Sequence, residues 1–382
     1  MISSRSGTKT PTDAAVARKL ERCLVSVVIK ALNEESGIEA TIESALRAVS
    51  KVGGEVVLAD SCSTDSTVEL AMKYPVRIVQ LANASERCCG VGPQLGYQHS
   101  SGEFIYLIDG DMQLLDGFLE HALDILAQQP DVAGVGGRVV ELNTDSLEYV
   151  SREQRVAVHR HTGSVDRLDG GGLYRRSAIE AAGYFSDRNL HSYEEYDLGV
   201  RLRALGWKLW RVPQGAVNHF GHDAPPYLLL MRRWRTRYVC GLGELIRAAA
   251  GQPRLPMVLA GLTELRLYLA VLLWWVLLFS VPLWPLSVVA RVIIFGLILA
   301  FPVAVMTWRK RSFNQALYAV VSWCFHSAGL LRGLLQKPRP QGDVIASTVL
   351  KEHSGLYVLP VQGMRARQPA PPFHKQEVQH AK

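Results

Sequence analysis

The chain has 382 residues, which is long enough for one large domain and a smaller unit. Hydrophobic residues make up 48% and charged residues 20%, so the composition excludes a globally disordered protein. The formal charge of +7 suits a phosphate-bearing partner or an anionic membrane. The basic residues are concentrated at Arg232–Arg254 and Arg309–Arg311, next to apolar runs, and this position favours a membrane over nucleic acid.

After an irregular start, short apolar strands alternate with helices. Residues 1–22 lack the apolar core of a signal peptide and are expected to be flexible. Buried strands are predicted at Val25–Ile29, Glu55–Ala59, Val76–Leu81 and Phe104–Ile108, and a helix at Ile38–Val49. Ser66 and Glu69 predict a capping box for the next helix. The alternation predicts a mostly parallel α/β sheet, in which ligands bind beyond the carboxyl ends of the strands.

Acidic residues stand directly after two of these strands. Asp60 follows the second strand and Asp109 the fourth. Asp109-Gly110-Asp111 holds two carboxylates two positions apart, which on an extended chain point the same way, and the glycine lets a ligand approach the backbone. Such a pair suits a hard divalent cation that bridges a diphosphate, although Asp-Gly-Asp is also a common turn.

A basic amphipathic helix is predicted at Tyr227–Ala250, within an interface region at residues 223–256. Its apolar face comprises Leu228, Met231, Trp234, Tyr238, Leu242, Leu245 and Ile246. Arg232, Arg233, Arg237 and Arg247 lie off that face, so they would meet lipid phosphates.

The region 257–336 is expected to lie in the membrane. Between Leu267 and Trp308 only Arg291 carries a charge, and this run is too long for one span of about 20 residues. Pro282 and Pro285 offer a turn between two antiparallel spans. The expected segments are spans at about 267–285 and 288–308, a third segment at about 316–335 that spans the membrane or lies in its interface, and a flexible tail at 337–382.

The distribution of charge predicts an orientation. Arg254 and Arg266 precede the first span and Arg309–Arg311 follow the second, so both clusters lie on one side. Because Lys and Arg are enriched on the cytoplasmic side, a multi-pass protein of the inner membrane is expected, with the domain of residues 23–222 in the cytoplasm. Six cysteines without a CxxC pattern also suit a reducing compartment.

Four motifs in order carry a resemblance to a known family. They are VSVVIKALNEE at Val25–Glu35, ADSCSTDST at Ala59–Thr67, YLIDGD at Tyr106–Asp111 and YEEYDLGVRLRALGWKL at Tyr193–Leu209. Over about Val25–Gly221 the chain resembles the family 2 glycosyltransferases, which have the GT-A fold. The resemblance implies an inverting transfer from a nucleoside-diphosphate sugar, assisted by Mg²⁺ or Mn²⁺. A UDP-sugar is the default donor because UDP is the most frequent carrier in the family.

The resemblance also assigns roles to positions. Donor-binding residues would be Ala31, Leu32, Asn33, Glu34, Asp60, Asp109, Gly171 and Gly172. Asp60 would face the base and Asp109 the ribose. The alternative for Asp60 and Asp65 is a turn and helix cap, which could be the whole role of Asp65. Asp111, with Asp109 and His219, would hold the metal, and an imidazole ligand suits Mn²⁺ better than Mg²⁺.

The general base is expected in Glu194-Glu195-Tyr196-Asp197-Leu198, which resembles the family's Glu-Asp-x-Asp-Leu segment. This chain carries Glu195 where the family has the basic Asp, so the acceptor would sit differently. Glu194 and Asp197 are the substitutes. Ser192 and Glu195 also match a capping box, in which case Glu195 would serve its own helix terminus.

Leu230–Trp234 resembles the QxxRW motif of processive members, with Leu230 in place of Gln. Arg232, Arg233 and Trp234 are therefore expected to contact lipid or diphosphate. Two or three spans leave no evident channel, which disfavours processive synthesis. The leading hypothesis is transfer of one sugar to a lipid-linked or cell-surface glycan. A polyprenyl-phosphate sugar synthase is the alternative, and a nucleotidyltransferase or a non-catalytic membrane scaffold is more remote.

Overall fold

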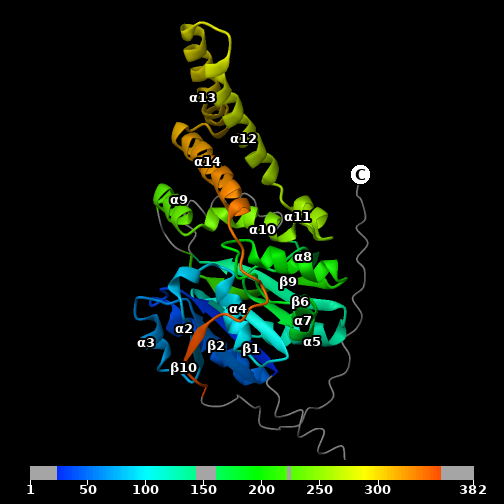
Figure 1. Cartoon of the computed structure of the whole chain (residues 1–382). Coiled ribbons are helices and arrows are strands. Elements are labelled where there is room, and N and C mark those ends of the chain that lie inside the picture. The colour runs from blue at the N-terminus through cyan, green and yellow to red at the C-terminus, as the bar shows by residue number, and fades with distance from the viewer. Residues whose placement is uncertain (1–23, 143–160, 222–224, 354–382) are drawn as a thin grey trace, which may run out of the picture.

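The computed structural model describes residues 24–142, 161–221 and 225–353, as a sheet domain from which a helical region projects (Figure 1). The expected flexible segment 1–22 lies outside the described residues. The strands are β1 (Val25–Ala31), β2 (Gly54–Asp60), β3 (Arg77–Leu81), β4 (Phe104–Asp109), β5 (Met112–Leu114), β6 (Val132–Glu141), β7 (Gly163–Val165), β8 (Gly172–Arg175), β9 (Lys208–His219) and β10 (Ser347–Lys351). The helices of the sheet domain are α2 (Ile38–Val52), α3 (Thr67–Ala71), α4 (Val91–Gln98), α5 (Phe118–Gln128), α7 (Arg176–Ala181) and α8 (Glu194–Ala204), with a 3₁₀ turn at Ala84–Glu86.

The sheet confirms the four predicted strands and adds a mixed half. Its order is β10-β3-β2-β1-β4-β8-β6-β9-β5, with β7 paired to β9. The strands β3, β2, β1 and β4 run parallel, whereas β8 is antiparallel to both of its neighbours. Helices α2 and α5 cover one face, and α4, α7 and α8 pack on the other, so the central strands are buried on both faces. The carboxyl ends of β1, β2 and β4 consequently meet at one edge.

Neither predicted capping box forms. Ser66 is the N-cap of α3 but makes no side-chain cap bond, and the carboxylate of Asp65 accepts from the N–H and hydroxyl of Thr67 instead. The residue before α8 is Tyr193, in a left-handed conformation, and the hydroxyl of Ser192 donates to the carbonyl of Tyr238. With Tyr193 as the N-cap, Ser192 stands one position too early for a capping box with Glu195.

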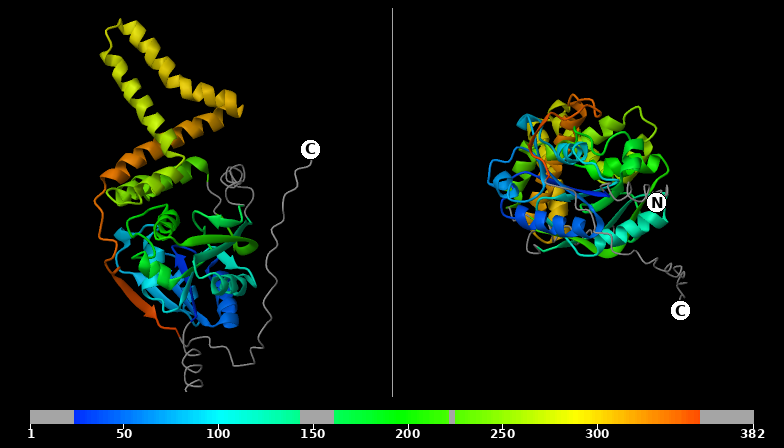
Figure 2. Two further views of the ribbon diagram at one scale, coloured as in Figure 1. Left: turned by 90° about the vertical axis from the view of Figure 1, so that its right-hand side faces the viewer. Right: turned by 90° about the horizontal axis from the view of Figure 1, so that it is seen from below.

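The helical region contains a hairpin that points away from the sheet (Figures 1 and 2). Its elements are α9 (Pro226–Arg235), a 3₁₀ turn at Tyr238–Cys240, α10 (Gly241–Ala249), α11 (Leu255–Gly261), α12 (Leu265–Ser280), a 3₁₀ turn at Val281–Leu283, α13 (Val288–Lys310) and α14 (Phe313–Leu335). Two segments are long and apolar enough to cross a membrane: Leu265–Leu283, of mean hydropathy 1.9, and Val288–Lys310, of mean hydropathy 2.6. The two expected apolar helices are thus confirmed, and their side chains are largely exposed.

The third segment, α14, returns from the hairpin to the sheet domain and packs on α10 (Figure 2). Three glycines allow the close approach. A methyl group added to Gly243 would lie 2.1 Å from the carbonyl oxygen of Leu330, and one added to Gly333 would lie 2.2 Å from that of Cys240. Gly329 and Gly333 of α14 therefore serve helix packing.

The single helix predicted at Tyr227–Ala250 is wrong. The chain breaks at Arg237, which has a φ of 62°, and α9 and α10 take different directions. The reason is tertiary: α10 buries Leu242, Glu244 and Leu245 inside the fold, whereas α9 buries only Leu230 among its residues. Only α9 keeps the exposed apolar and basic faces expected of an interface helix.

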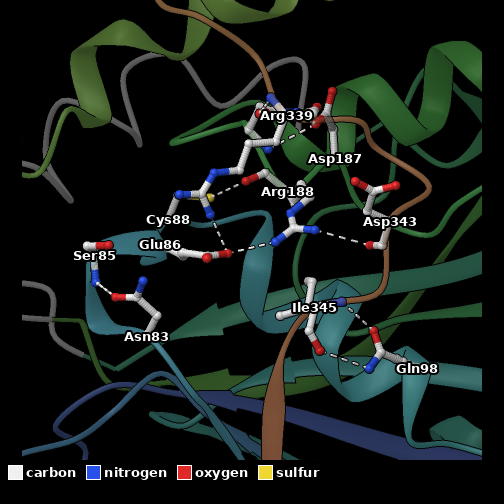
Figure 3. Close-up of polar contacts among 11 residues, drawn as sticks. Asn83, Ser85, Glu86, Cys88, Gln98, Asp187, Arg188, Arg339, Asp343 and Ile345 are labelled. Carbon is white, nitrogen blue, oxygen red and sulfur yellow. Dashed lines mark hydrogen bonds and ion pairs between the residues drawn. The ribbon is translucent and has the colours of Figure 1, made fainter.

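The flexible tail predicted from residue 337 is also wrong as far as residue 353. This segment, the strap, crosses the sheet domain and ends in β10, which pairs antiparallel with β3 (Figures 1 and 3). Arg339 and Arg188 both pair with the carboxylate of Glu86. Ile345 exchanges two hydrogen bonds with the side chain of Gln98, at 2.9 and 3.1 Å. The remaining part of the predicted tail, 354–382, lies outside the described residues.

Candidate active site

Hydrogen bonds join the loop after β1 to the loop after β2. Asn33, with a φ of 60°, accepts from the N–H of Thr64 at 2.7 Å, and Glu34 N–H donates to Thr67 at 2.8 Å. Ala31 is buried at the end of β1, and Leu32 is exposed beside it. These bonds fix the backbone of the predicted donor loop, Ala31–Glu34, without a ligand.

Asp60 is completely buried at the end of β2. Its carboxylate accepts from the N–H of Ser63 at 3.0 Å and from the amide of Gln80 at 2.9 Å. Arg87 lies next to it and donates to the carbonyls of Ser61 and Cys62. In this arrangement Asp60 shapes the loop and presents no exposed surface to a base.

Lys30, which sequence reasoning missed, joins two of the predicted site residues. Its Nζ lies 3.1 Å from the carboxylate of Asp109 and 3.4 Å from that of Glu194. Burial alone would lower the pKa of Lys30, but the two carboxylates outweigh it and raise that pKa well above its usual value. Lys30 therefore remains charged and links the end of β4 to the start of α8.

Asp109 and Asp111 do not point the same way, as an extended chain would require. The backbone turns at Gly110 and Asp111, between β4 and β5. Asp109 pairs with Lys30, whereas the Oδ2 of Asp111 lies 3.3 Å from Nε2 of His219. The glycine is required because a methyl group at Gly110 would lie 2.7 Å from the side chain of Glu34. The two carboxylates consequently have separate partners.

His219 lies between two carboxylates. Its Nδ1 is 2.7 Å from Glu141, a residue that the sequence did not single out, and its Nε2 faces Asp111. Pairing of β9 with both β5 and β6 creates this geometry, because Met112 and Glu141 are the register partners of His219. Burial would lower the pKa of His219, but the two carboxylates raise it to about 9.

The surroundings fit a cation, although among the described residues no group of three or more His, Cys, Asp or Glu side chains could hold a metal ion by itself. Burial, and then the charges of Asp111 and Asp109, raise the pKa of Glu34 to about 8. The carboxylates of Glu34, Asp109 and Asp111 therefore lie close enough together to repel one another, and a bound cation would relieve that repulsion. A histidine whose second nitrogen meets a carboxylate, as His219 meets Glu141, is also the usual setting of a metal ligand.

The three carboxylates at the start of α8 have different surroundings. Asp197 is buried and pairs with Arg201 at 2.7 Å, and Arg201 in turn donates to the carbonyls of Tyr184 and Phe185. Glu194 pairs with Lys30. In the part of the chain that the structure describes, Glu195 has no hydrogen-bond or ion-pair partner.

Glu195 lines a small cavity with Glu194, together with Pro93, Leu107, Tyr174, Phe185, Ser186 and Leu198. Burial, followed by the charge of Glu194, raises the pKa of Glu195 well above that of an ordinary carboxyl, and Lys30 offsets part of the effect. A carboxylate with a raised pKa and no partner is a suitable proton acceptor.

The glycine run before β8 is packed closely against β4. Gly171 has a φ of 85°, and its N–H donates to the carbonyl of Leu107. A methyl group on Gly172 would lie 2.9 Å from the ring of Tyr174. Gly171 and Gly172 are buried, so their first role is to let this loop approach the strand that ends in Asp109.

The basic segment of α9 divides in two. Trp234 packs edge-on against Phe325 of α14 and lies under Arg332, so it fastens α9 to α14. Arg232 is exposed, and its charge is felt by the carboxyl of Glu34. Arg233 lies over the ring of Tyr238. Arg232 is therefore accessible for the expected contact with lipid or diphosphate. Trp234 is occupied by its packing on α14, which obstructs that contact.

Comparison with known proteins places this architecture. A model of the family described as glycosyl transferase family 2 matches residues 26–183. Probable glucomannan 4-beta-mannosyltransferase 10 of Arabidopsis thaliana is 24% identical over 59% of this chain and 44% of that protein. Succinoglycan biosynthesis protein ExoA of Rhizobium meliloti is 26% identical over 51% of this chain and 62% of that protein. The chain thus spans about half the length of these relatives.

A solved structure shares the fold. The mannosyltransferase PcManGT from Pyrobaculum calidifontis, in complex with GDP-Man and Mn²⁺, is 18% identical, with a TM-score of 0.52 over 82% of this chain and 88% of that chain. The family match covers the strands β1, β2 and β4, whose ends carry Lys30, Asp60 and Asp109. Over residues 26–183 the chain is therefore similar to the family 2 glycosyltransferases, and its sheet domain has the GT-A fold.

Proposed function

We propose that this chain is a membrane-anchored, inverting glycosyltransferase that moves one sugar from a nucleoside-diphosphate sugar to a hydroxyl of a lipid-linked or cell-surface glycan. The observation that carries the proposal is the position of Glu195. Of the three carboxylates at the start of α8, it is the one for which the described residues supply no ion-pair partner, and it lines a small cavity with Leu107 of β4. Deprotonation of an attacking hydroxyl requires such a group.

The donor would lie over the ends of β1, β2 and β4. Asn33 and the backbone after Asp60 would surround the nucleoside, with Asp109 at the ribose. Two similar proteins are named mannosyltransferases and one was solved with GDP-Man, so GDP-mannose joins the UDP-sugars as a donor to test. By pairing with both Asp109 and Glu194, Lys30 would fix the donor-binding part of the site relative to the helix that carries the base.

A divalent cation would be held by Asp111 and His219, with donor diphosphate oxygens as further ligands. Glu141 would fix the orientation of the imidazole. When bound, Mg²⁺ or Mn²⁺ would neutralise the charge that develops on the leaving diphosphate. Asp109 is the weaker ligand candidate, since it pairs with Lys30.

The hairpin of α12 and α13 would cross the membrane. Both of its ends near the sheet domain carry basic residues, Arg266 at one and Arg309–Arg311 at the other, which supports a cytoplasmic catalytic domain. Arg291 lies near the opposite tip, where it donates to the carbonyl of Pro282. The exposed Tyr227, Leu228 and Arg232 of α9 would rest on the inner surface, each basic residue adding about 1 kcal/mol on anionic lipid.

The acceptor class separates this proposal from a polyprenyl-phosphate sugar synthase. A phosphate acceptor is already ionised, so it would not require Glu195, whereas a hydroxyl would. The test uses the full chain in nanodiscs with GDP-mannose, UDP-glucose and UDP-N-acetylglucosamine, each with Mg²⁺ or Mn²⁺. Transfer is measured to a membrane lipid extract and to polyprenyl phosphate. Transfer to the extract that is lost in Glu195→Gln supports the proposal, and transfer to polyprenyl phosphate that survives Glu195→Gln supports the synthase.

A further inference from the structure

The segment that leads into α8 is held by helices of the membrane-proximal half of the chain. His191 contacts Glu244 of α10 twice. The backbone N–H of His191 donates to one carboxylate oxygen at 2.9 Å, and the imidazole Nδ1 lies 2.8 Å from the other. Glu244 is completely buried. Ser192 donates to the carbonyl of Tyr238 at 2.8 Å. Both anchors come from residues C-terminal to the family match.

The next residues reach the membrane hairpin itself. The phenol of Tyr193 donates to the carboxylate of Glu264, the N-cap residue of α12. The phenol of Tyr196 is 3.1 Å from the carbonyls of Met257 and Val258 in α11. Glu264 thus joins the first turn of the first apolar helix to the residue immediately before Glu194.

Two glycines make these contacts possible. A methyl group on Gly241 would lie 2.0 Å from Oγ of Ser192 and 2.7 Å from its carbonyl oxygen. One on Gly261 would lie 2.0 Å from Oη of Tyr196. Helices α10 and α11 therefore lie directly against the backbone and side chains of the base segment, with no room for adjustment.

An apolar core accompanies the polar contacts. It joins Leu190, Tyr196 and Val200 of the base region with α10, α11 and α14, and Tyr193 packs on it. The inner face of α8 belongs to the separate core of the sheet. Helix α8 is consequently shared between the two halves of the molecule.

Tyr193 is also strained. Its φ of 69° and ψ of 14° lie in the left-handed region, which a bulky side chain occupies only when its surroundings impose it. The carbonyl of Tyr193 accepts the N–H of Asp197, and its phenol is held by Glu264. The two ends of one residue are thus fixed by α8 and by α12.

We propose that Tyr193 and Glu264 form a positioning pair that sets the place of the Glu195 carboxylate from the first turn of the membrane hairpin. The hairpin then takes part in turnover as well as in anchoring. This inference rests on the proposed function of Glu195. Among the described residues no hydrogen bond or ion pair joins either residue of the pair to the predicted donor loop, so the pair is expected to act on the acceptor half of the reaction.

The test compares Tyr193→Phe, Glu264→Gln and the double variant in full-length protein in nanodiscs. The matched control is Tyr74→Phe, which removes another phenol-to-carboxylate bond, to Glu43 at 3.0 Å. Tyr74 lies between α3 and β3, before the amino end of β3 and away from the carboxyl ends of the strands that carry the site. Turnover and donor KM are measured with the nucleotide sugar that reacts fastest in the panel above, and with GDP-mannose hydrolysis if transfer is absent. Hydrogen exchange of residues 190–198 is measured alongside.

Each single variant is expected to lower kcat about tenfold or more, because a small displacement of a catalytic group is costly, while donor KM stays within about twofold. The double variant should be no worse than either single one, since both remove the same contact. Exchange at residues 190–198 should become faster in Tyr193→Phe and Glu264→Gln and remain unchanged in Tyr74→Phe.

Two outcomes are kept apart by Glu195→Gln. If that variant is inactive while Tyr193→Phe and Glu264→Gln keep normal kcat, the positioning pair is refuted and the base assignment stands. If Glu195→Gln turns over normally, the proposed function fails, and hydrogen exchange then decides about the pair. Unchanged exchange in Glu264→Gln overturns it, as does a higher donor KM at constant kcat.

Discussion

The Nζ of Lys30 lies 3.4 Å from the carboxylate of Glu194, although 164 positions separate the two residues. This contact closes the site between the strand β1 and the helix α8. The same ammonium group holds Asp109. One cation therefore pairs with both Asp109 and Glu194, whereas Glu195 has no ion-pair partner among the described residues.

Lys30→Met should shift the acid limb of the pH profile to higher pH. The ammonium group lowers the pKa of Glu195 against the opposing effects of burial and Glu194, so its removal raises that pKa further. A fall in kcat/KM should then begin at a higher pH than in wild type. Lys73→Met, which removes a surface pair with Glu39, is the control and should leave the profile unchanged. A profile that does not move in Lys30→Met would contradict the link.

Glu195→Gln should lower kcat by about 10²-fold or more, with little change in donor binding. In wild type, activity should be lost on acidification well above pH 4.3, the usual pKa of a glutamate, because burial raises the pKa of Glu195 and only the ionised form accepts a proton. Stopped-flow or radiolabel transfer assays between pH 4 and 9 measure this. An acid limb near pH 4 would mean that another base operates.

Asp197→Ala should destabilise the fold. The residue pairs with Arg201 inside the protein, and breaking a buried pair by removing one partner costs about 3–5 kcal/mol. Urea unfolding followed by intrinsic fluorescence measures the loss, with Asp166→Ala as a more exposed control on the same domain. Full stability combined with lost turnover would instead make Asp197 the base.

Asp111→Asn and His219→Gln should both abolish the stimulation by Mn²⁺. Glu141→Gln should weaken Mn²⁺ activation by about 10- to 100-fold without abolishing it, as expected of a residue that only orients a ligand. Titration of activity with Mn²⁺ at fixed donor gives the apparent affinity. If Glu141→Gln matches wild type over the whole titration, the orienting role is wrong.

Glu86→Gln should raise donor KM while kcat is kept. Glu86 forms ion pairs with Arg188 and Arg339. The next residue, Arg87, donates hydrogen bonds to the carbonyls of Ser61 and Cys62 beside the predicted nucleoside. Arg339→Ala should act in the same direction but by about fivefold at most, because this arginine is half exposed. Lys337→Ala, on the exposed part of the strap, is the control.

The sequence predicted the parallel half of the sheet well, because β1, β2 and β4 are buried on both faces and read as continuous apolar runs. It also singled out Asp109, Asp111, His219 and the carboxylates of α8, whose roles in the site stay predictions. Lys30 and Glu141 were missed since neither lies in a local pattern of its own. Their roles arise from pairing β1 with β4 and β6 with β9.

Other errors have the same origin. The apolar spacing of Tyr227–Ala250 is helical, but two glycines in α10 are selected by contacts with Ser192 and α14, and these contacts break the helix. The strand β10 has the short sequence Ser-Thr-Val-Leu-Lys, which becomes a strand through the free edge of β3. The residues that form these contacts are far apart in the sequence, so a local sequence pattern cannot predict the contacts.

The place of β10 in the sheet orders the events of biosynthesis. The strand that completes the β3 edge is translated after both apolar helices, so the ribosome must pass residue 351 before the sheet can close. In the proposed membrane arrangement, insertion of the hairpin of α12 and α13 can therefore begin while β3 still has an unpaired edge. We expect the contacts of the strap with β3 and Glu86 to form late in folding, after the rest of the sheet.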